Sequence, residues 1–589
     1  MANSLFRTKK IESILAEGGD ETHGGGLKRV LTVKDLTFFG IAAILGAGSF
    51  SSLGEAVNKG GPGVVVLFII TGIACAFTAF CYSEFASRIP VAGSAYTYSY
   101  ASFGEVFAWI IGWALIMEYS IGNIYVAFSW SDYFTSFLSK LNIHIPDYLT
   151  CSYAEAHQAV LGKLTAGPQT DELIQTWNTA PMIGGLRIIL DLPAFIINIL
   201  ISILVYIGIK ESRNFSNVMV ILKLAIVALI ILVGGGMIFS LGTTGNWTPV
   251  NDAGVHSFMP NGFGGVMAAV SGVFFAYIGF DAVSVLAEES KNPQRDLPRG
   301  MILSLVICTV IYILLTLTLT GAVNYRFLGV GDPLAFIFEK ENLNIGWMQL
   351  LVSICAVVAM TSVLLVFQMG QPRIWMSMSR DGLLPPVFQK IHPKFKTPSF
   401  ASIVTGLVVG IPILFTDKKF VLDFTSIATL FAFVLVCGGV LLIPRKEKVA
   451  GRFHLPYING QFIYPLLVAL AIVLIAVYAK GYFSDAFNFD FSANPDYTNP
   501  DPNLRVSFMD LATPKISILL FWGICIILSI VTFIKKYSLI PLMGVTTCLY
   551  LLTGMTKSNW AWFLGWLLIG LVIYFLYGYR KSKLAGRSS

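Results

Sequence analysis

The stretch Phe38–Ser52 reads FFGIAAILGAGSFSS. It starts as an apolar helix, but Gly46, Gly48 and the serines that follow stand in the middle of the run. A glycine in a helix interior costs about 1 kcal/mol relative to alanine, so we expect this helix to be interrupted. A second stretch, Ser271–Asp281, reads SGVFFAYIGFD and interrupts another apolar run with a glycine and an acid. The two stretches predict two broken helices.

Both stretches lie in a strongly apolar chain. Of its 589 residues, 55% are hydrophobic and 12% are charged, and the mean hydropathy is +0.73. Soluble globular proteins carry about 25% charged residues. Runs of about 20 apolar residues recur along the chain, and each predicts a spanning helix, because backbone groups inside a bilayer must be paired within their own segment. The composition therefore predicts an all-α integral membrane protein.

The apolar runs predict about fourteen transmembrane helices, at residues 36–57, 63–87, 98–130, 185–209, 215–240, 260–286, 299–323, 346–376, 399–416, 420–443, 462–480, 515–534, 537–554 and 558–579. With a cytoplasmic N-terminus and alternating sides, most of the 40 Lys and Arg residues fall in cytoplasmic segments. Loops on the cytoplasmic side of a membrane are enriched in these residues. We therefore expect a multi-pass protein of the cell (plasma or inner) membrane with both termini in the cytoplasm.

The two interrupted helices are the first and the sixth in this order. Broken helices five spans apart are typical of an inverted five-plus-five repeat, whose substrate site lies at the breaks. The alternative is that the glycines only let neighbouring helices pack closely, as small residues commonly do in membranes.

An unwound helix in mid-membrane offers amide donors and carbonyl acceptors, which suits a zwitterion. Glycine also permits close approach to the backbone. We expect the first break to bind a carboxylate through the amides of Ala47, Gly48 and Ser49. The carbonyl groups expected to bind an ammonium belong to Ile44, Phe275, Ala276 and Ile278.

Two ionisable residues stand well inside predicted spans. Lys223 lies in VMVILKLA, and a lysine at a helix centre costs about 2.5–3.5 kcal/mol on insertion scales. It is predicted to be a coupling or gating cation, the alternative being a side chain that snorkels to the surface. Glu118, in the third span, is predicted to line the substrate path, or else to pair with a structural neighbour. Asp281 is better explained by helix termination.

Several short motifs resemble the amino acid–polyamine–organocation (APC) superfamily, and most closely its cationic amino acid transporter (CAT) family with the bacterial members. They are spread in order over about residues 30–445. The motifs are Gly46-Ala47-Gly48, Pro90–Tyr96, Phe274–Asp281, Glu288-Glu289 followed by Asn292-Pro293 and Pro298, and Ser379–Pro385.

The resemblance implies the leucine-transporter-like fold, with ten core helices in two inverted repeats and additional C-terminal helices. It implies that the breaks bind the α-amino and α-carboxylate groups, with the substrate side chain facing the third, sixth and eighth helices. Lys223 matches the fifth-helix lysine of bacterial members, which occupies the ion space of sodium-coupled relatives, and Glu118 matches a third-helix glutamate. Ser49 departs from the family, which usually has an aliphatic residue there.

The expected organisation has a cytoplasmic tail, a transporter core and an addition. The segments are a tail at 1–35, a ten-helix core at 36–445 with repeats at about 36–240 and 260–445, further transmembrane helices at 446–579, and a cytoplasmic tail at 580–589. The tail at 1–35 lacks the apolar segment of a signal peptide. The long extracellular loop at about 131–184 has no assigned role.

The function expected from these features is secondary active transport of an L-amino acid by alternating access, coupled to protons. An exchanger or a non-transporting amino-acid sensor on the same fold is the alternative. A channel would show charged rings or filter loops, and an enzyme would show clustered His, Cys or carboxylates, whereas the six histidines lie scattered outside the predicted spans. No cofactor, metal ion or nucleic acid is expected. Neutral and cationic substrates, and a partner subunit, stay open.

Overall fold

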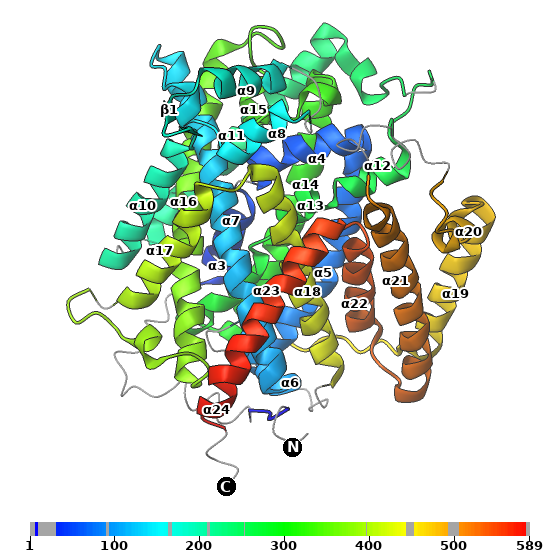
Figure 1. The fold of residues 1–589 in the computed structure, drawn as a ribbon. Helices are drawn as coiled ribbons and strands as arrows, with labels where there is room; N and C mark the ends of the chain where they lie inside the picture. Colours follow the sequence, from blue (N-terminus) through cyan, green and yellow to red (C-terminus); the bar gives the residue numbers. More distant parts are fainter. Residues whose placement is uncertain are drawn as a thin grey trace.

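The computed structural model describes residues 6–9, 31–46, 48–89, 94–162, 168–208, 213–251, 254–395, 397–442, 453–492 and 506–584. These residues form a bundle of long helices (Figure 1). Nine described helices are long and apolar enough to cross a membrane, one bent pair passes the same test together, and three more apolar helices are shorter. The all-α membrane class is confirmed.

Each of the fourteen predicted spans has a helical counterpart among the described residues. The first five are α3 (Val33–Ile44) with η2 (Gly48–Ser52) and α4 (Leu53–Gly60), then α5 (Val64–Arg88), α7 (Glu105–Lys140), α10 (Leu192–Ile207) and α11 (Arg213–Leu241). The next five are α12 (Gly262–Ala268) with α13 (Val270–Phe275) and η6 (Phe280–Glu289), then α14 (Pro293–Ala322), α16 (Gly346–Arg380), α17 (Ser399–Ile413) and α18 (Lys418–Leu442). The last four are α19 (Gly460–Tyr478), α21 (Phe508–Lys535), α22 (Leu539–Leu552) and α23 (Lys557–Ile573).

Each set of five therefore begins with a broken span, which is the arrangement of the leucine-transporter-like fold. Both ends of the described chain lie at one end of the bundle (Figure 1). There the Lys9 ammonium contacts the Asp381 carboxylate at 2.8 Å, and the Lys583 amide donates to the Asp381 carbonyl at 3.1 Å. Both termini on one side agree with an even number of spans.

Two predicted boundaries were wrong. The run from residue 98 is split into α6 (Ser94–Ser102) and α7, because Gly104 has a φ of +98°, which interrupts the helix. The run from residue 185 begins instead as a hairpin, in which β1 (Met182–Ile183) pairs with β2 (Leu186–Arg187). Gly184 and Gly185 turn this hairpin with φ values of +57° and +84°. Glycine adopts such angles without steric cost, so local turn chemistry outweighed the apolar composition.

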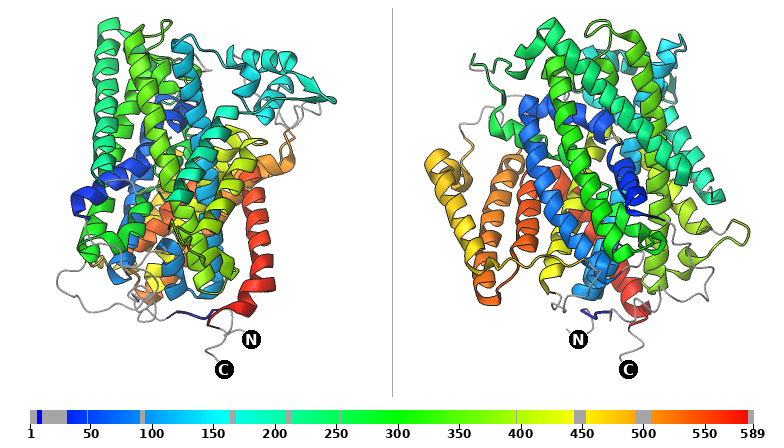
Figure 2. Two further views of the ribbon diagram at one scale, coloured as in Figure 1. Left: turned by 90° about the vertical axis from the view of Figure 1, so that its left-hand side faces the viewer. Right: turned by 180° about the vertical axis from the view of Figure 1, so that it is seen from behind.

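The long loop between α7 and α10 folds into a cap, which we define as the described residues 141–162 and 168–190. It contains α8 (Tyr153–Val160), α9 (Pro168–Thr179) and the hairpin. The cap has a small hydrophobic core of its own, formed by Ala156, Ala180 and Ile189 with Trp177 and other partly buried neighbours. It projects from one end of the bundle (Figure 2).

The helices after α18 attach to the bundle in two ways. α23 lies against α7, where the Trp113 and Trp566 rings stack at 4.7 Å and each indole donates to the other residue's carbonyl. The most apolar 18-residue windows of α19 and α21 are each only 17% buried. Apolar faces of this kind are those that lipid covers in a membrane.

Candidate functional site

The first break separates α3 from η2. The Gly46 amide donates to the Ile44 carbonyl at 2.9 Å, and the amides of Ser49 and Phe50 both donate to the Gly46 carbonyl at 3.1 Å. Ala47, a predicted carboxylate ligand, lies outside the described residues. The Ser49 amide is present at the break as predicted, but here it donates to the backbone, so a bound carboxylate would share or replace that contact.

The sixth span is interrupted between α13 and η6. The Tyr277 amide donates to the Phe274 carbonyl at 2.9 Å, and the Ile278 amide donates to the Phe275 carbonyl at 3.1 Å. Gly279 then adopts a φ of +113°, which ends this turn and starts η6. The span is also bent by 44° nearer its beginning, between α12 and α13.

The two breaks touch through glycines. A Cβ atom on Gly48 would lie 2.6 Å from the Ala276 Cα atom, and one on Gly279 would lie 3.0 Å from the Ala43 Cβ atom. Real Cβ contacts are not this short to a backbone atom, so only glycine fits at position 48 in this packing. The glycines that interrupt the helices therefore also bring the interrupted segments together.

Two of the predicted carbonyl groups converge on one hydroxyl. The Tyr312 hydroxyl of α14 lies 2.8 Å from the Ile44 carbonyl oxygen and 2.7 Å from the Ala276 carbonyl oxygen. A tyrosine hydroxyl has a single proton and can donate fully to only one acceptor at a time. The two carbonyl groups, one from each break, thus retain acceptor capacity at a shared point in the core.

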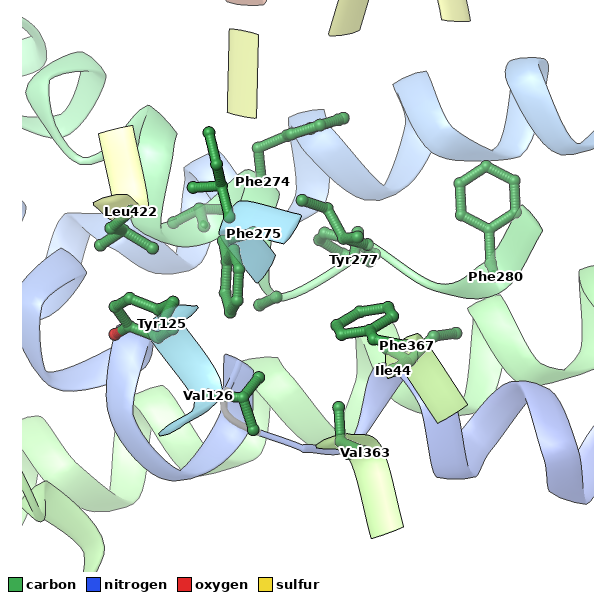
Figure 3. Packing of buried hydrophobic residues seen from close by; sticks show 14 of the residues in the cluster. Ile44, Tyr125, Val126, Phe274, Phe275, Tyr277, Phe280, Val363, Phe367 and Leu422 are labelled. Carbon is green, nitrogen blue, oxygen red and sulfur yellow. The ribbon is translucent and has the colours of Figure 1, made fainter. Parts of the chain in front are cut away.

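Apolar side chains surround the breaks (Figure 3). Val126 of α7 and Val363 and Phe367 of α16 lie on one side, with Ile44 and Phe275 of the broken spans close by. All five are at most 5% exposed. The Tyr125 ring meets the Phe275 ring edge-on at 4.5 Å. These contacts come from the third, sixth and eighth spans, together with the first.

Glu118 does not join this apolar group. The residue is 4% exposed, and its carboxyl interacts with Asp281 of η6 and with Thr429 of α18. The Asp281 carboxylate lies near the backbone amides of Gly279 and Ala282, at the start of η6. Asp281 thus satisfies amides at a helix beginning, and Glu118 lies beside it rather than at the apolar walls.

Lys223 is buried, with 3% of its surface exposed. Its ammonium reaches from α11 to the carbonyl of Ala42 in α3, at 3.4 Å. Ala42 lies two residues before Ile44, the last residue of α3. The side chain therefore points into the protein at the first broken span and does not snorkel to a membrane surface.

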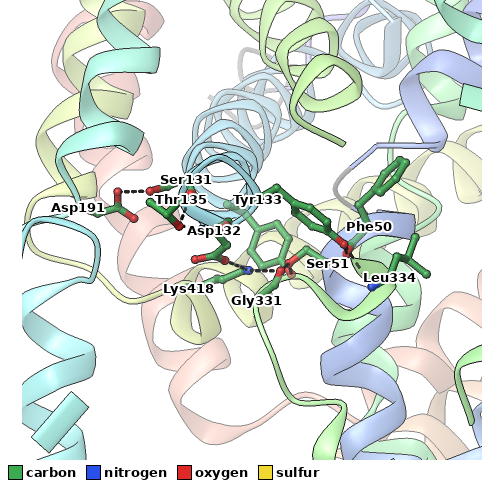
Figure 4. A network of polar contacts seen from close by, with 11 residues as sticks. Phe50, Ser51, Ser131, Asp132, Tyr133, Thr135, Asp191, Gly331, Leu334 and Lys418 are labelled. Atoms are coloured by element: carbon green, nitrogen blue, oxygen red, sulfur yellow. Dashed lines mark hydrogen bonds and ion pairs between the residues drawn. The ribbon is translucent and has the colours of Figure 1, made fainter. Parts of the chain in front are cut away.

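A polar network lies between the breaks and the cap (Figure 4). The Lys418 ammonium, at the start of α18, donates to the Asp132 carboxylate of α7 at 2.5 Å and to the Gly331 carbonyl at 3.4 Å. The Ser51 hydroxyl of η2 donates to the same Gly331 carbonyl at 3.2 Å. The ammonium also lies 5.5 Å from the centre of the Tyr125 ring. We call Lys418, Asp132, Gly331 and Ser51 the outer seal.

A second contact holds the same end of η2. The Tyr133 hydroxyl of α7 donates to the Phe50 carbonyl at 2.5 Å and accepts from the Leu334 amide of α15 (Pro333–Phe336) at 3.3 Å. The first broken span, the third span and the loop before α16 are therefore joined above the breaks.

Sequence reasoning missed Tyr312 and the outer seal. Tyr312 stands in the apolar run of α14 with nothing local to mark it. Lys418 and Asp132 are 286 residues apart and each reads as an ordinary charge near a helix end. Arg373, half-buried in α16, was also missed, although an arginine within a predicted span is a signal by itself.

No group of three or more His, Cys, Asp or Glu residues with metal-site geometry occurs in the described part of the chain. All eight cysteines, each of them described, are free thiols. The site thus consists of backbone groups, apolar walls and a few buried polar side chains.

Two family models match most of the chain. The chain matches a family model described as amino acid permease over residues 31–509, and a model for the C-terminus of that family over residues 537–582. A solved structure, MhsT in complex with L-phenylalanine, aligns with 73% of this chain and 95% of its own at 15% identity and a TM-score of 0.46.

Curated relatives align over most of the chain. It is 35% identical to the branched-chain amino acid permease BcaP of Bacillus subtilis, over 99% of this chain and 100% of the relative. It is 38% identical to the methylthioribose transporter of Bacillus subtilis, over 77% of this chain and 89% of the relative. It is 30% identical to the vacuolar cationic amino acid transporter 2 of Arabidopsis thaliana, over 99% of this chain and 93% of the relative. The chain therefore belongs to the amino acid permease family of the APC superfamily, as a bacterial-type member related to the cationic amino acid transporters.

Proposed function

We propose that this permease is a proton-coupled symporter that carries a neutral, aliphatic L-amino acid across the cell membrane by alternating access. In this proposal both termini lie in the cytoplasm and the cap lies outside. The core at 36–445 binds and moves the substrate, and the helices at 446–579 support the core.

The observation that carries the proposal is the meeting of the Ile44 and Ala276 carbonyl groups at Tyr312. An ammonium has three N–H donors and satisfies several carbonyl oxygens at once, which a single hydroxyl proton does not. The α-amino group of the substrate would bind these two carbonyl groups. Its α-carboxylate would bind amides of the first break at Gly48 and Ser49, where the N-terminal end of η2 favours negative charge.

The walls around the breaks favour an aliphatic side chain. Val126, Val363 and Phe367 supply apolar contacts and no charge. Burying a cationic side chain against them would cost several kcal/mol without a partner. Glu118 is such a partner in principle, but it lies with Asp281 and Thr429. The name of BcaP, a branched-chain amino acid permease, points the same way.

Lys223 is the residue we propose for coupling. Its ammonium contacts the Ala42 carbonyl in the first broken span. Loss of a proton from Lys223 would weaken this contact, and thereby link protonation to the position of α3. A charge held inside a membrane domain in this way is typical of proton and ion pathways.

The test is uptake by purified protein in liposomes with an inward proton gradient. Labelled leucine, arginine and methylthioribose are compared with and without the gradient. We expect leucine alone to accumulate, and to accumulate only with the gradient. Gradient-driven arginine or methylthioribose uptake without leucine uptake would contradict the substrate class.

The same liposomes separate the competing functions. Leucine uptake that needs a preloaded amino acid and ignores the gradient would identify an exchanger. Leucine binding without any uptake would identify a sensor. Either result would contradict proton symport.

A further inference from the structure

The cap reaches the outer seal through α8. The side-chain amide of Gln158 donates to the Asp417 carboxylate at 3.1 Å, and the other oxygen of that carboxylate accepts from the Phe420 amide at 2.8 Å. Asp417 therefore holds the first turn of α18 and receives a contact from the cap. The next residue, Lys418, is the cation of the outer seal.

Glu155 lies nearly one turn before Gln158 on the same helix. Its carboxyl interacts with the Asp132 carboxylate and the Lys418 ammonium, which form the ion pair of the outer seal, and also with the carboxylates of Asp417 and Glu55. Glu155 therefore adds a further acidic group to a place where one lysine already pairs with an acid.

The cap also has contacts within itself that do not involve the outer seal. Ser152 caps the beginning of α8, where its hydroxyl accepts from the Glu155 amide at 3.1 Å, and the buried residues of the helix are Ala156 and Ala159. Ala156 packs in the small hydrophobic core of the cap. The Leu190 amide donates to the Tyr148 carbonyl at 3.0 Å and joins the two ends of the cap. A unit with its own core can move without unfolding.

We propose that the cap is a lid over the outer end of the substrate path, and that Glu155 and Gln158 are the residues that hold it on the outer seal. This inference depends on the proposed function in one respect, because it takes the path under the lid to be the substrate path. With the lid in place, α8 covers the Lys418–Asp132 pair, and lifting it exposes that pair to water.

The charges around Glu155 determine how the stability of the closed lid changes with pH. Burial, together with the carboxylates of Asp132, Asp417 and Glu55, raises the pKa of Glu155 from 4.5 to about 7, although Lys418 partly offsets this. With the lid lifted, Glu155 is exposed and its pKa returns to the usual value of about 4.3. The closed lid therefore holds the proton more tightly. Closure is most favourable below about pH 4.3 and loses stability as pH rises to about 7.

A second acid with a raised pKa, Asp332, lies next to the seal residue Gly331 and interacts with the Lys418–Asp132 pair. Burial, Glu339 and Asp132 raise the pKa of Asp332 from 3.8 to about 7, and Ser136 and Lys418 lower it. Removing the charge of Glu155 alone therefore reduces the pH response without abolishing it.

The test measures access to the site below the seal and requires no transport. A cysteine is introduced by Val126→Cys in a Cys151→Ser background, and a membrane-impermeant methanethiosulfonate reagent is added on the side that bears the cap. Labelling rates are compared at about pH 5 and about pH 8 for the parent, Glu155→Gln and Glu172→Gln. Glu172 is the matched control, because it lies in the same cap on α9 and interacts with Asp147 rather than with the seal.

We expect Glu155→Gln to be labelled at least roughly tenfold more slowly than Glu172→Gln at the higher pH, and the difference between the two variants to be smaller at the lower pH. Comparison at one pH removes the effect of thiol ionisation. We expect Gln158→Ala to be labelled faster than the parent at both pH values. Equal rates for the two glutamine variants at the higher pH, or no labelling of the parent there, would overturn the lid.

These outcomes are distinct from failure of the proposed function. Labelling that follows the expected pattern in a protein that does not take up leucine would support the lid and contradict proton symport.

Discussion

The polar groups at the breaks in the first and sixth spans and those of the outer seal find their partners in opposite ways. At the breaks, backbone carbonyl groups and amides bond to one another and to the Tyr312 hydroxyl, with apolar side chains around them. In the outer seal, an ammonium and a carboxylate from distant segments pair with each other and with the Gly331 carbonyl. In the proposed function, the first region binds a ligand that brings its own charges, whereas the second is satisfied by its own side chains.

This difference separates binding from closure. A site that leaves acceptor capacity on two carbonyl groups gains stability when a charged ligand supplies donors. A pair that is already satisfied gains nothing from the ligand, and in the proposed function it breaks when the substrate path opens. Changes at the breaks should therefore alter affinity and accumulation, whereas changes in the seal should alter rates.

The largest effect is expected from Gly48→Leu. Its Cβ atom would lie 2.6 Å from the Ala276 Cα atom, so the two breaks would be pushed apart and the shared carbonyl point lost. We expect leucine binding to fall by more than about a hundredfold, which corresponds to a loss of about 2.8 kcal/mol.

Equilibrium binding of labelled leucine to purified protein measures this loss. Gly236→Leu is the control, because a Cβ atom on this exposed glycine of α11 meets nothing within 4 Å. Normal affinity of a monodisperse Gly48→Leu protein would remove the first break from the site.

The next effect is expected from Lys223→Ala. The substitution removes the cation that contacts the Ala42 carbonyl, but leaves the carbonyl groups at Tyr312 in place. We expect gradient-driven accumulation to disappear while leucine affinity changes by less than about tenfold.

Accumulation and binding are measured on the same liposome preparation. Lys535→Ala, at the exposed end of α21, serves as the control. Accumulation by Lys223→Ala with its pH dependence unchanged would exclude Lys223 from coupling.

The smallest of these effects is expected from Lys418→Met. It breaks the ion pair of the outer seal and leaves Asp132 without its cation. A hydrogen bond to a charged group contributes about 1.5–3 kcal/mol, so we expect dissociation of bound leucine towards the cap side to become roughly tenfold faster.

Stopped-flow release of labelled leucine measures this rate. Lys419→Met is the matched control, because Lys419 is the exposed neighbour of Lys418 on the same turn. Equal release rates for the two methionine variants would show that the ion pair does not limit opening.

Much of the fold was predictable because its signals are local. Runs of about 20 apolar residues must form helices in a bilayer whatever surrounds them. The glycines at 46, 48 and 279 weaken a helix at their own positions, and the structure interrupts the first and sixth spans there. The boundaries at Gly104 and Gly184 were missed because a positive φ was needed at each, and apolar composition carries no information about it.

The sequence by itself determined that this chain spans a membrane many times, that two of its helices are interrupted, and that Lys223 lies in an apolar span. These properties depend on neighbours within one helix. Only the tertiary structure decided that Tyr312 joins the carbonyl groups of both breaks, that Glu118 lies with Asp281, and that Lys418 pairs with Asp132. Each of these contacts joins helices that are far apart in the sequence, and no local preference of either partner encodes the distance between them.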